Sequence, residues 1–356
     1  GSSPFPLIDM AADEVNEYRE KHEIKESWSS AGEFFETLEK KHPACNQACL
    51  LGHGTLRLAV MGEKDVRPDK NSMENMKKEI EKALKEGCIG LSTGLIYIPG
   101  FFADEDELTE LTKSVSEQDG FYASHIRGEG DSLIEAVKEA ISIGTGAGCS
   151  TQVSHLKASA PRNWGKVDQA IEMIEEAENS GLDVFFDKYP YTAGSTTLMS
   201  DLPKWSVAEG RDRLMEYLSD PETRKKIFSE ADEQTEGKNK WASVIIIDAG
   251  SDKYREYEGK NINEIAELTG QSIEFTFSDI LIRSRGETDI VCFTQSQEDT
   301  DKALTHRLGL VCTDSGVWAP YGPLSRVKPH PRAYGAFPKF LKDYVKDKEA
   351  MPLEEA

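Results

Sequence analysis

Short apolar segments alternate with longer amphipathic segments along most of this 356-residue chain. The apolar segments predict β-strands at 48–54, 87–94, 120–126, 149–157, 182–190, 242–250, 288–295 and 308–315. The amphipathic segments predict helices, among them 71–87, 104–120, 131–148 and 163–181. Strands and helices that alternate about every thirty residues are typical of parallel βαβ units. We therefore expect an α/β fold.

Polar side chains at the carboxyl ends of the predicted strands favour one α/β fold over another. They are His53, His125, His155, Tyr189 and Asp314. An α/β barrel gathers the residues of its active site at this end of its strands. A doubly wound sheet would instead need a GxGxxG turn between a strand and a helix, and no such turn occurs in that context. The pattern predicts a TIM-like (β/α) barrel.

One long segment, 191–288, interrupts the alternation of strands and helices. Most of it is polar and helical in pattern, and an isolated apolar run, IIIDAG, and a further helix, INEIAELTG, follow. We expect an inserted α+β subdomain near the active-site rim, where such insertions commonly shape substrate pockets. The chain would then divide into 1–190, the N-terminal part of the barrel, 191–288, the insertion, and 289–356, the last barrel strand and the C-terminal helices.

The net charge and the hydropathy exclude some classes of partner. The chain has 42 basic and 64 acidic residues, a formal charge of -22. Nucleic-acid binding depends on clustered lysine and arginine, so we expect no nucleic-acid partner. No apolar run approaches the roughly 20 residues that cross a bilayer, and the N-terminus does not resemble a signal peptide. We therefore expect a cytoplasmic protein without a membrane partner.

Two histidines follow serine at the ends of neighbouring predicted strands, His125 in FYASHIRGEG and His155 in STQVSHLKAS. Two imidazoles and a strand-end carboxylate form a common hydrolytic zinc site, in which Asp314 would move the proton. A single strand-end histidine would more often be a structural residue that is satisfied by hydrogen bonds. For His53 both interpretations remain open. We also expect the Arg-Gly-Glu-Gly segment after His125 to form a tight turn from strand to helix, with Arg127 and Glu129 bracing the rim.

Seven segments in order resemble the N-acyl-D-amino-acid deacylase, or D-aminoacylase, family of the amidohydrolase superfamily. They are GHGTLRLAVMG, GCIGLSTGLIYIPGFFADEDEL, FYASHIRGEGDSLIEAVKEAI, VSHLKASAPRNWGK, DKYPYTAGSTTL, TDS and KPHPRAYGAFPKFL. The resemblance covers nearly the whole chain. It implies a barrel of the metal-dependent hydrolase type and a small-molecule N-acyl-D-amino acid as the substrate.

The resemblance also implies a role for individual residues. His125 and His155 match the family's two zinc ligands from the middle barrel strands, and Asp314 matches the aspartate that activates water and protonates the leaving amine. The remaining matches are residues that bind the substrate, namely Lys157, Tyr189 and Ser195 near the scissile amide and Arg332 at the α-carboxylate. A tyrosine can polarise a carbonyl as an oxyanion donor, and an arginine can pair with a carboxylate through two hydrogen bonds.

The chain departs from the family pattern at its first strands. The family carries an HxH pair and a zinc-binding cysteine there, whereas this chain has no HxH, and none of its six cysteines matches that position. Its opening GSSPFPLID resembles the sequence that follows the family's cysteine, so we expect a chain truncated at both ends. An incomplete barrel would expose unpaired sheet edges, which favour self-association.

Three hypotheses for the function follow. The first is zinc-dependent hydrolysis of N-acyl-D-amino acids to a carboxylate and a D-amino acid. The second is a catalytically inactive barrel fragment that self-associates or pairs with a missing N-terminal segment. The third is a cyclic amidohydrolase of the hydantoinase or dihydroorotase kind. We expect the third least, because such enzymes use a lysine between two metals and only Lys157 lies near a suitable strand end.

Overall fold

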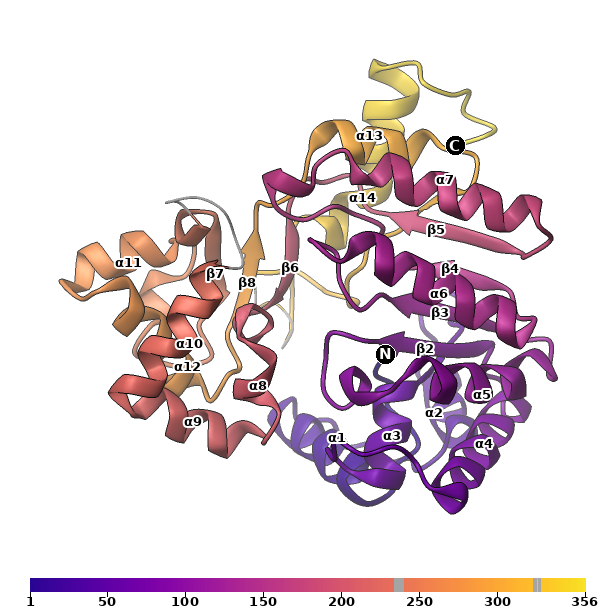
Figure 1. Ribbon diagram of the computed structural model, residues 1–356, viewed down its shortest axis with the longest axis horizontal. Helices are drawn as coiled ribbons and strands as arrows, with labels where there is room; N and C mark the ends of the chain where they lie inside the picture. Colours follow the sequence, from indigo (N-terminus) through magenta and orange to yellow (C-terminus); the bar gives the residue numbers. More distant parts are fainter. Residues whose placement is uncertain (234–239, 323–324, 326–327) are drawn as a thin grey trace. The chain divides into compact units, whose positions relative to one another are not determined.

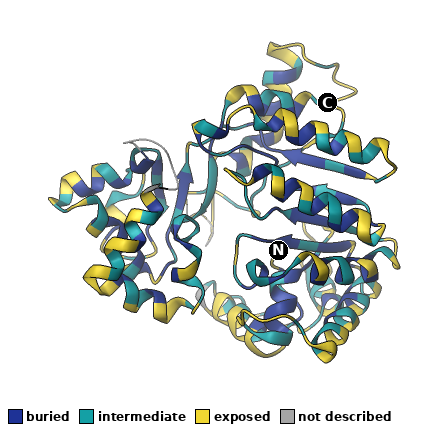
Figure 2. Cartoon of the chain, in the orientation of Figure 1, coloured by how far each residue is buried: buried dark blue, intermediate teal, exposed yellow. Residues whose placement is uncertain are grey.

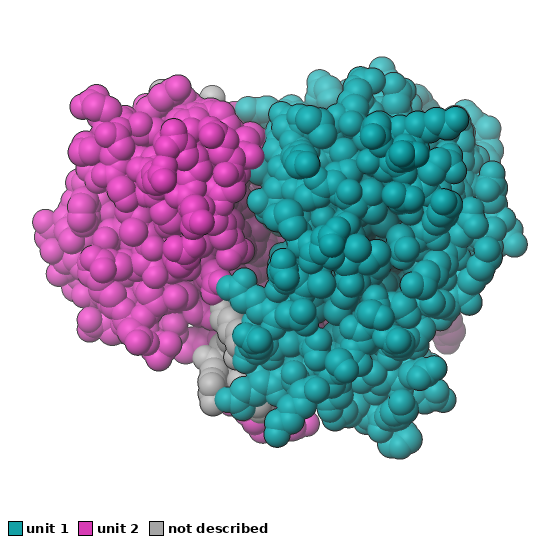
Figure 3. Space-filling view, turned by 90° about the horizontal axis from the view of Figure 1, so that it is seen from below, with its two compact units in different colours: residues 1–156, 168–187, 308–310 teal, residues 157–167, 188–307, 311–356 magenta. Residues whose placement is uncertain are grey.

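The computed structural model of the protein describes residues 1–233, 240–322, 325 and 328–356. The chain divides into two compact units, coloured separately in Figure 3. Unit 1 comprises residues 1–156, 168–187 and 308–310, and unit 2 comprises 157–167, 188–307 and 311–356. Both units are therefore built from separate stretches of the chain.

Unit 1 contains a six-stranded sheet with the order β1-β2-β3-β4-β5-β9, of which β2 to β5 are labelled in Figure 1. Its strands are β1 (Leu51–Gly52), β2 (Gly90–Gly94), β3 (Phe121–His125), β4 (Thr151–Val153), β5 (Val184–Lys188) and β9 (Gly309–Val311). The last residues of β5 and β9, Lys188 and Val311, are already part of unit 2. The pairs from β1 to β5 are parallel. Position 90 must be a glycine, because a Cβ there would lie 2.0 Å from the carbonyl oxygen of Phe121 on β3. The expected α/β fold with a parallel sheet is confirmed.

The helices of unit 1 have clear signals at their ends. They are α1 (Asp9–Lys21), α2 (Ala31–Lys41), α3 (His53–Met61), α4 (Lys70–Lys85), α5 (Glu105–Ser116), α6 (Leu133–Ala147) and α7 (Lys166–Asn179). The Asp104 carboxylate accepts a hydrogen bond from the backbone N–H of Glu107 at 2.9 Å and caps α5. Helix α6 ends at Gly148 in the left-handed conformation. The four helices predicted from the sequence are confirmed as α4 to α7.

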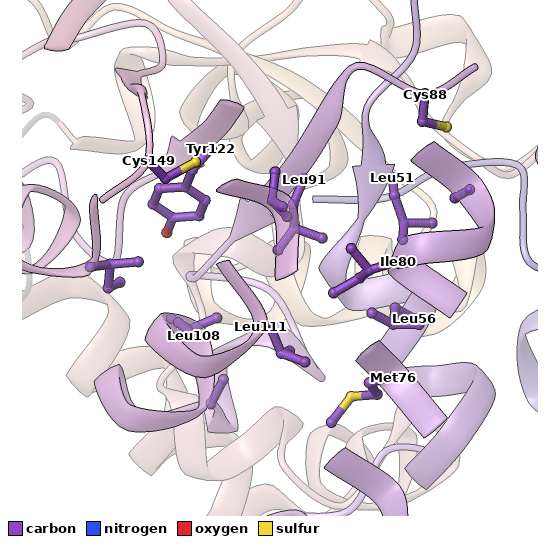
Figure 4. Packing of buried hydrophobic residues seen from close by; sticks show 14 of the residues in the cluster. Leu51, Leu56, Met76, Ile80, Cys88, Leu91, Leu108, Leu111, Tyr122 and Cys149 are labelled. Carbon is purple, nitrogen blue, oxygen red and sulfur yellow. The ribbon is translucent and has the colours of Figure 1, made fainter. Parts of the chain in front are cut away.

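The main hydrophobic core of unit 1 lies between the sheet and its helices (Figure 4). Leu51 and Leu91 come from β1 and β2, Ile80 comes from α4, and Leu108 and Leu111 come from α5. All five side chains are buried. On α4 the buried residues recur every three or four positions, which is the spacing that keeps them on one helix face.

Unit 2 contains a three-stranded antiparallel sheet with the order β6-β8-β7. Its strands are β6 (Gly194–Thr197), β7 (Val244–Asp248) and β8 (Asp289–Cys292). Its helices are α8 (Lys204–Val207), α9 (Arg211–Ser219), α10 (Pro221–Glu233), α11 (Ile262–Thr269), α12 (Ile273–Ser284), α13 (Gln297–Thr305) and α14 (Arg332–Phe340). Figure 2 shows that the strands of this sheet are mostly buried or half-buried.

One predicted strand belongs to a different sheet from the one expected. The segment 288–295, expected as the next barrel strand after the insertion, contains β8, which pairs antiparallel with β6 and β7. An apolar run identifies a strand but not the strands beside it, so the pattern could not assign β8 to a sheet. The strand and helix expected around IIIDAG and INEIAELTG are confirmed as β7 and α11. Residues 234–239 of the expected insertion lie outside the described residues.

No helix in the described ranges combines the length and the apolar character that a membrane span requires.

The predicted strand at 48–54 is much shorter than expected, because α3 begins at His53. His53 Nε2 lies 3.0 Å from Glu107 Oε1, and the same oxygen accepts a hydrogen bond from Arg57 Nε at 3.1 Å. All three side chains are buried. Arg57 also donates to the backbone carbonyl oxygens of Lys64 at 2.9 Å and Val66 at 2.6 Å. His53 is therefore held by a buried ionic cluster that joins α3 to α5.

Replacing Glu107 by alanine should lower the free energy of unfolding by about 3–5 kcal/mol, because it leaves the buried Arg57 without its carboxylate. Urea unfolding monitored by circular dichroism would measure the change. Glu110→Ala is the matched control, since Glu110 lies on the same helix and its two ion pairs, to Lys113 and Lys77, are partly exposed and worth at most about 1 kcal/mol each. Equal losses in the two variants would contradict a stabilising role for the buried cluster.

Candidate metal and substrate site

The two strand-end histidines lie together in unit 1. His125 is the last residue of β3, and His155 follows β4 by two residues. The strands are parallel, with Ser124 paired to Val153, so both side chains lie at the carboxyl edge of the sheet. His125 Nδ1 is 2.8 Å from His155 Nε2, and the two rings meet edge to face with their centroids 4.4 Å apart. The structure thus brings together the pair that the sequence predicted.

The next strand fixes the backbone of His155. His155 has a φ of +42°, in the left-handed region that few residues other than glycine adopt. Its N–H donates to the Asp187 carboxylate at 2.6 Å, and the N–H of Leu156 donates to the backbone carbonyl oxygen of Asp187 at 2.9 Å. Asp187 was not expected to have a role. The sequence feature that could have indicated this role is a carboxylate directly after the apolar run of β5.

The turn after β3 supplies a carboxylate to the second histidine. Glu129 Oε1 lies 3.0 Å from Nδ1 of His155. Arg127 donates from Nε to both carboxylate oxygens of Glu139 on α6, each at 3.0 Å, and from Nη1 to the backbone carbonyl oxygen of Phe101 at 2.7 Å. The Arg127 contacts hold the turn between β3 and α6, whereas Glu129 contacts His155.

The donor set suits a divalent transition metal. His125, Glu129 and His155 each offer a ligand atom, and these atoms lie within 4.8 Å of one another. Imidazole nitrogen is a good ligand for zinc. Two nitrogens bound to one tetrahedral zinc lie about 3.3 Å apart, so the 2.8 Å separation of the histidine nitrogens would have to open only slightly. The residues therefore fit a metal ion of this kind.

In unit 2 a buried tyrosine stands among three cationic side chains. The Tyr189 ring has Lys188 Nζ at 4.1 Å, the Arg332 guanidinium at 4.6 Å and Lys157 Nζ at 5.7 Å from its centroid. Gln295 Nε2 donates to the Tyr189 hydroxyl oxygen at 2.8 Å, and Lys188 donates to the Gln295 amide oxygen. Lys157 and Tyr189 were predicted site residues, whereas Gln295 and Lys188 were missed because nothing in their spacing predicted burial.

Besides the Tyr189 ring, Arg332 contacts two further predicted residues of unit 2. Its Nη1 lies 2.7 Å from the Asp314 carboxylate, and its Nη2 donates to the backbone carbonyl oxygen of Ser195 at 3.3 Å. Arg332 is 6% exposed, whereas the Asp314 side chain is 31% exposed, so water reaches the carboxylate but hardly the guanidinium. Asp314 has a φ of +45°, in the left-handed region like His155. Unit 2 thus brings Asp314, Ser195, Tyr189, Lys157 and Arg332 together, while His125 and His155 belong to unit 1.

A histidine that was not predicted supports this cluster. The Arg332 backbone N–H donates to His330 Nδ1 at 3.0 Å, and the His330 ring meets Tyr191 edge to face at 5.3 Å. Burial, and then the Arg332 charge, lower the pKa of His330 from about 6.5 to about 4, against a hydrogen bond with the Ala193 backbone that raises it. His330 is therefore neutral at pH 7. The sequence feature that could have indicated its role is its place in KPHPR, two residues before Arg332.

Comparisons with known proteins agree with the resemblance in the sequence. The chain is 30% identical over 325 residues to an N-acyl-D-glutamate deacylase of Alcaligenes xylosoxydans xylosoxydans, and 27% identical over 324 residues to a D-aminoacylase of the same organism. Each match covers 91% of this chain. No protein-family model matches.

Solved structures give the same result. An N-acyl-D-glutamate deacylase from Bordetella bronchiseptica, solved with zinc and a phosphonate inhibitor, matches 94% of this chain with a TM-score of 0.74 and 28% identity. A D-aminoacylase matches 92% with a TM-score of 0.70 and 27% identity. The chain spans 56% and 57% of the two curated relatives and 60% and 59% of the two solved chains.

The stability of the protein should fall as the pH drops from about 6.5 to about 4, by up to about 3 kcal/mol from His330 alone. The folded-state pKa of His330 is depressed to about 4, so the neutral ring stabilises the fold above the unfolded-state pKa, and this contribution is lost as the pH falls. Because carboxylates also titrate in this range, the measurement compares urea unfolding of the wild type and His330→Gln at each pH. If the free energies of unfolding of the wild type and His330→Gln change with pH in parallel, the contribution assigned to His330 is contradicted.

Proposed function

We propose that this chain, a homologue of the N-acyl-D-amino-acid deacylases over nine tenths of its length, carries the residues for zinc-dependent hydrolysis of N-acyl-D-amino acids. The facing nitrogens of His125 and His155 are the observation that carries the proposal, because they present two ligands to one point. We further propose that the parallel sheet is part of a (β/α) barrel that this chain contains incompletely.

The chemistry of an amide needs an activated water, a proton donor for the leaving nitrogen and a stabilised carbonyl oxygen. Zinc, when bound by His125 and His155, would lower the pKa of a water toward neutrality. Asp314 would accept a proton from the attacking water at a carboxylate oxygen and deliver it to the leaving nitrogen. Tyr189, whose hydroxyl group is oriented by Gln295, would donate to the carbonyl oxygen as negative charge develops there.

Substrate binding would involve Arg332, Lys157 and Ser195. Arg332 can hold an α-carboxylate through two hydrogen bonds, and the contact to the Ser195 carbonyl oxygen orients its guanidinium. Lys157 adds a second positive charge beside Tyr189. The names of the relatives, N-acyl-D-glutamate deacylase, N-acyl-D-aspartate deacylase and D-aminoacylase, support a substrate with a free carboxylate.

The ion pair between Arg332 and Asp314 gives the proposal a further consequence. Arg332 binds Asp314 at 2.7 Å, although the proposed roles require Arg332 to bind the substrate and Asp314 to move a proton. An incoming α-carboxylate would therefore replace Asp314 on the guanidinium and release the aspartate for proton transfer. An N-acyl amine without a carboxylate should leave the pair intact. Both the kcat and the affinity for this compound should therefore be lower than for the corresponding N-acyl-D-amino acid.

The proposal predicts that the purified chain binds zinc and hydrolyses the D-form of an N-acetyl-amino acid in preference to the L-form. Elemental analysis gives the zinc content, and a D- and L-panel of N-acetyl-methionine, N-acetyl-glutamate and N-acetyl-aspartate gives the selectivity. Zinc close to stoichiometric with D-selective turnover is the expected result. Absence of both would instead favour the inactive barrel fragment.

Asp314→Asn should reduce kcat by about 10²–10⁴-fold, because an amide cannot accept and return the proton. Steady-state kinetics on the D-substrate would show this loss, while the zinc content should stay unchanged. Asp212→Asn is the matched control, since this exposed carboxylate pairs with Arg285 elsewhere in unit 2. Full activity of Asp314→Asn would refute the proposed role.

Arg332→Lys should lower kcat/KM by about 10–100-fold, because lysine cannot reproduce the two parallel hydrogen bonds of a guanidinium. The loss should be largest for substrates with an α-carboxylate and small for an N-acyl amine. Arg285→Lys, which keeps an exposed pair with Asp212, serves as the control. A uniform loss over all substrates would show that Arg332 acts in folding rather than in recognition.

A further inference from the structure

We infer that Glu129 is a positioning residue that holds His155 in the tautomer whose Nε2 is unprotonated and available to a metal. The inference rests on the proposed zinc site and adds a residue to it. It depends on three contacts at the carboxyl edge of the sheet of unit 1. These are Glu129 to His155 Nδ1, His155 Nε2 to His125 Nδ1, and the His155 backbone to Asp187.

The first step is the direction of the contact between Glu129 and His155. A neutral imidazole carries one N–H, and an ionised carboxylate can only accept a hydrogen bond. At 3.0 Å from Glu129 Oε1, Nδ1 of His155 is therefore the protonated nitrogen. The lone pair of the ring is then on Nε2. This is the atom that faces His125, so the metal-binding nitrogen of His155 is prepared before any metal arrives.

The second step concerns His125. Because His155 Nε2 is an acceptor, Nδ1 of His125 must donate the hydrogen bond across the 2.8 Å between them. When a metal is bound, His125 carries its proton on Nε2 instead, whereas the protonation of His155 does not change. A proton of His125 thus occupies the position of the metal in the metal-free protein, and only one of the two rings has to change its tautomer.

The third step is that the surroundings keep Glu129 and His155 in place. The side chains of Glu129 and His155 are 16% and 8% exposed, so water competes only weakly with their contact. Arg127 and Glu139 hold the turn that carries Glu129, and the Asp187 carboxylate holds the backbone N–H of His155. A carboxylate on the second nitrogen of a metal-binding histidine raises the basicity of that ligand and fixes its orientation.

An alternative role for Glu129 is that of a third metal ligand, since its oxygen belongs to the same cluster. The observed contact argues against it. The two nitrogens of an imidazole ring point away from each other, and Glu129 contacts Nδ1 while His125 lies beside Nε2. Glu129 Oε1 thus contacts a different nitrogen of the His155 ring from the one that faces His125.

Nitrogen NMR of the metal-free, ¹⁵N-labelled protein tests the inference directly. In the wild type His155 should be the tautomer protonated at Nδ1. In Glu129→Ala it should move toward protonation at Nε2, the form that free imidazole side chains prefer. Glu139→Gln is the matched control, because Glu139 has the same 16% exposure and braces the same turn without contacting either ring. An unchanged His155 tautomer in Glu129→Ala would overturn the inference.

Zinc affinity, measured by competition with a chromophoric chelator, provides the second readout. Loss of the carboxylate should weaken binding by about 10–100-fold in Glu129→Ala, and Glu129→Gln, whose amide oxygen can still accept from Nδ1, should lose less. X-ray absorption that shows an oxygen of Glu129 bound to the metal in the wild type would overturn the inference. A wild type that binds no zinc would refute the proposed metal site, and the NMR result would still decide the role of Glu129.

Discussion

Parallel hydrogen bonding between β3, β4 and β5 determines where the proposed metal-binding side chains lie. Val153 of β4 pairs with Ser124 on one side and with Phe186 on the other, so the three strands end at the same edge of the sheet. His125 and His155 meet there, and the carboxylate that follows Phe186 reaches the backbone of His155. A shift of one residue in either pairing would turn these side chains to the opposite faces of their strands. The sheet register is therefore a precondition for the site.

Much of the architecture of unit 1 follows from the regular spacing of apolar residues along the sequence. Helices α4 to α7 and strands β2 to β5 lie where apolar spacing predicted them, because each must bury one face or both faces against its neighbours. The assignment of β8 failed for a physical reason. Its side-chain pattern fits either a parallel or an antiparallel neighbour, and its partners β6 and β7 are distant in sequence or separated from it by helices. The start of α3 at His53 depended on the buried contact with Glu107, which no local pattern encodes.

The placement of candidate site residues was predictable where a residue type and a strand end coincide, as at His125 and His155. The partners of these residues were not predictable to the same degree, because they depend on which buried groups meet after folding. Spacing does not reveal that Asp314 pairs with Arg332 or that a neutral His330 accepts the Arg332 backbone N–H. A buried ion pair or hydrogen bond is selected by desolvation, and desolvation is a property of the packed protein.

The left-handed backbone at His155 and Asp314 has a consequence for how sequence variation at these positions should be interpreted. That conformation costs most residues about 1–2 kcal/mol, and it is most accessible to glycine, asparagine, aspartate and histidine. The chain path alone therefore restricts the substitutions that drift can accept there, even in a lineage that no longer needs the chemistry. Retention of histidine or aspartate at these two positions among relatives is therefore weak evidence of selection for catalysis. Retention of histidine at position 125 would be stronger evidence, because His125 ends a regular strand.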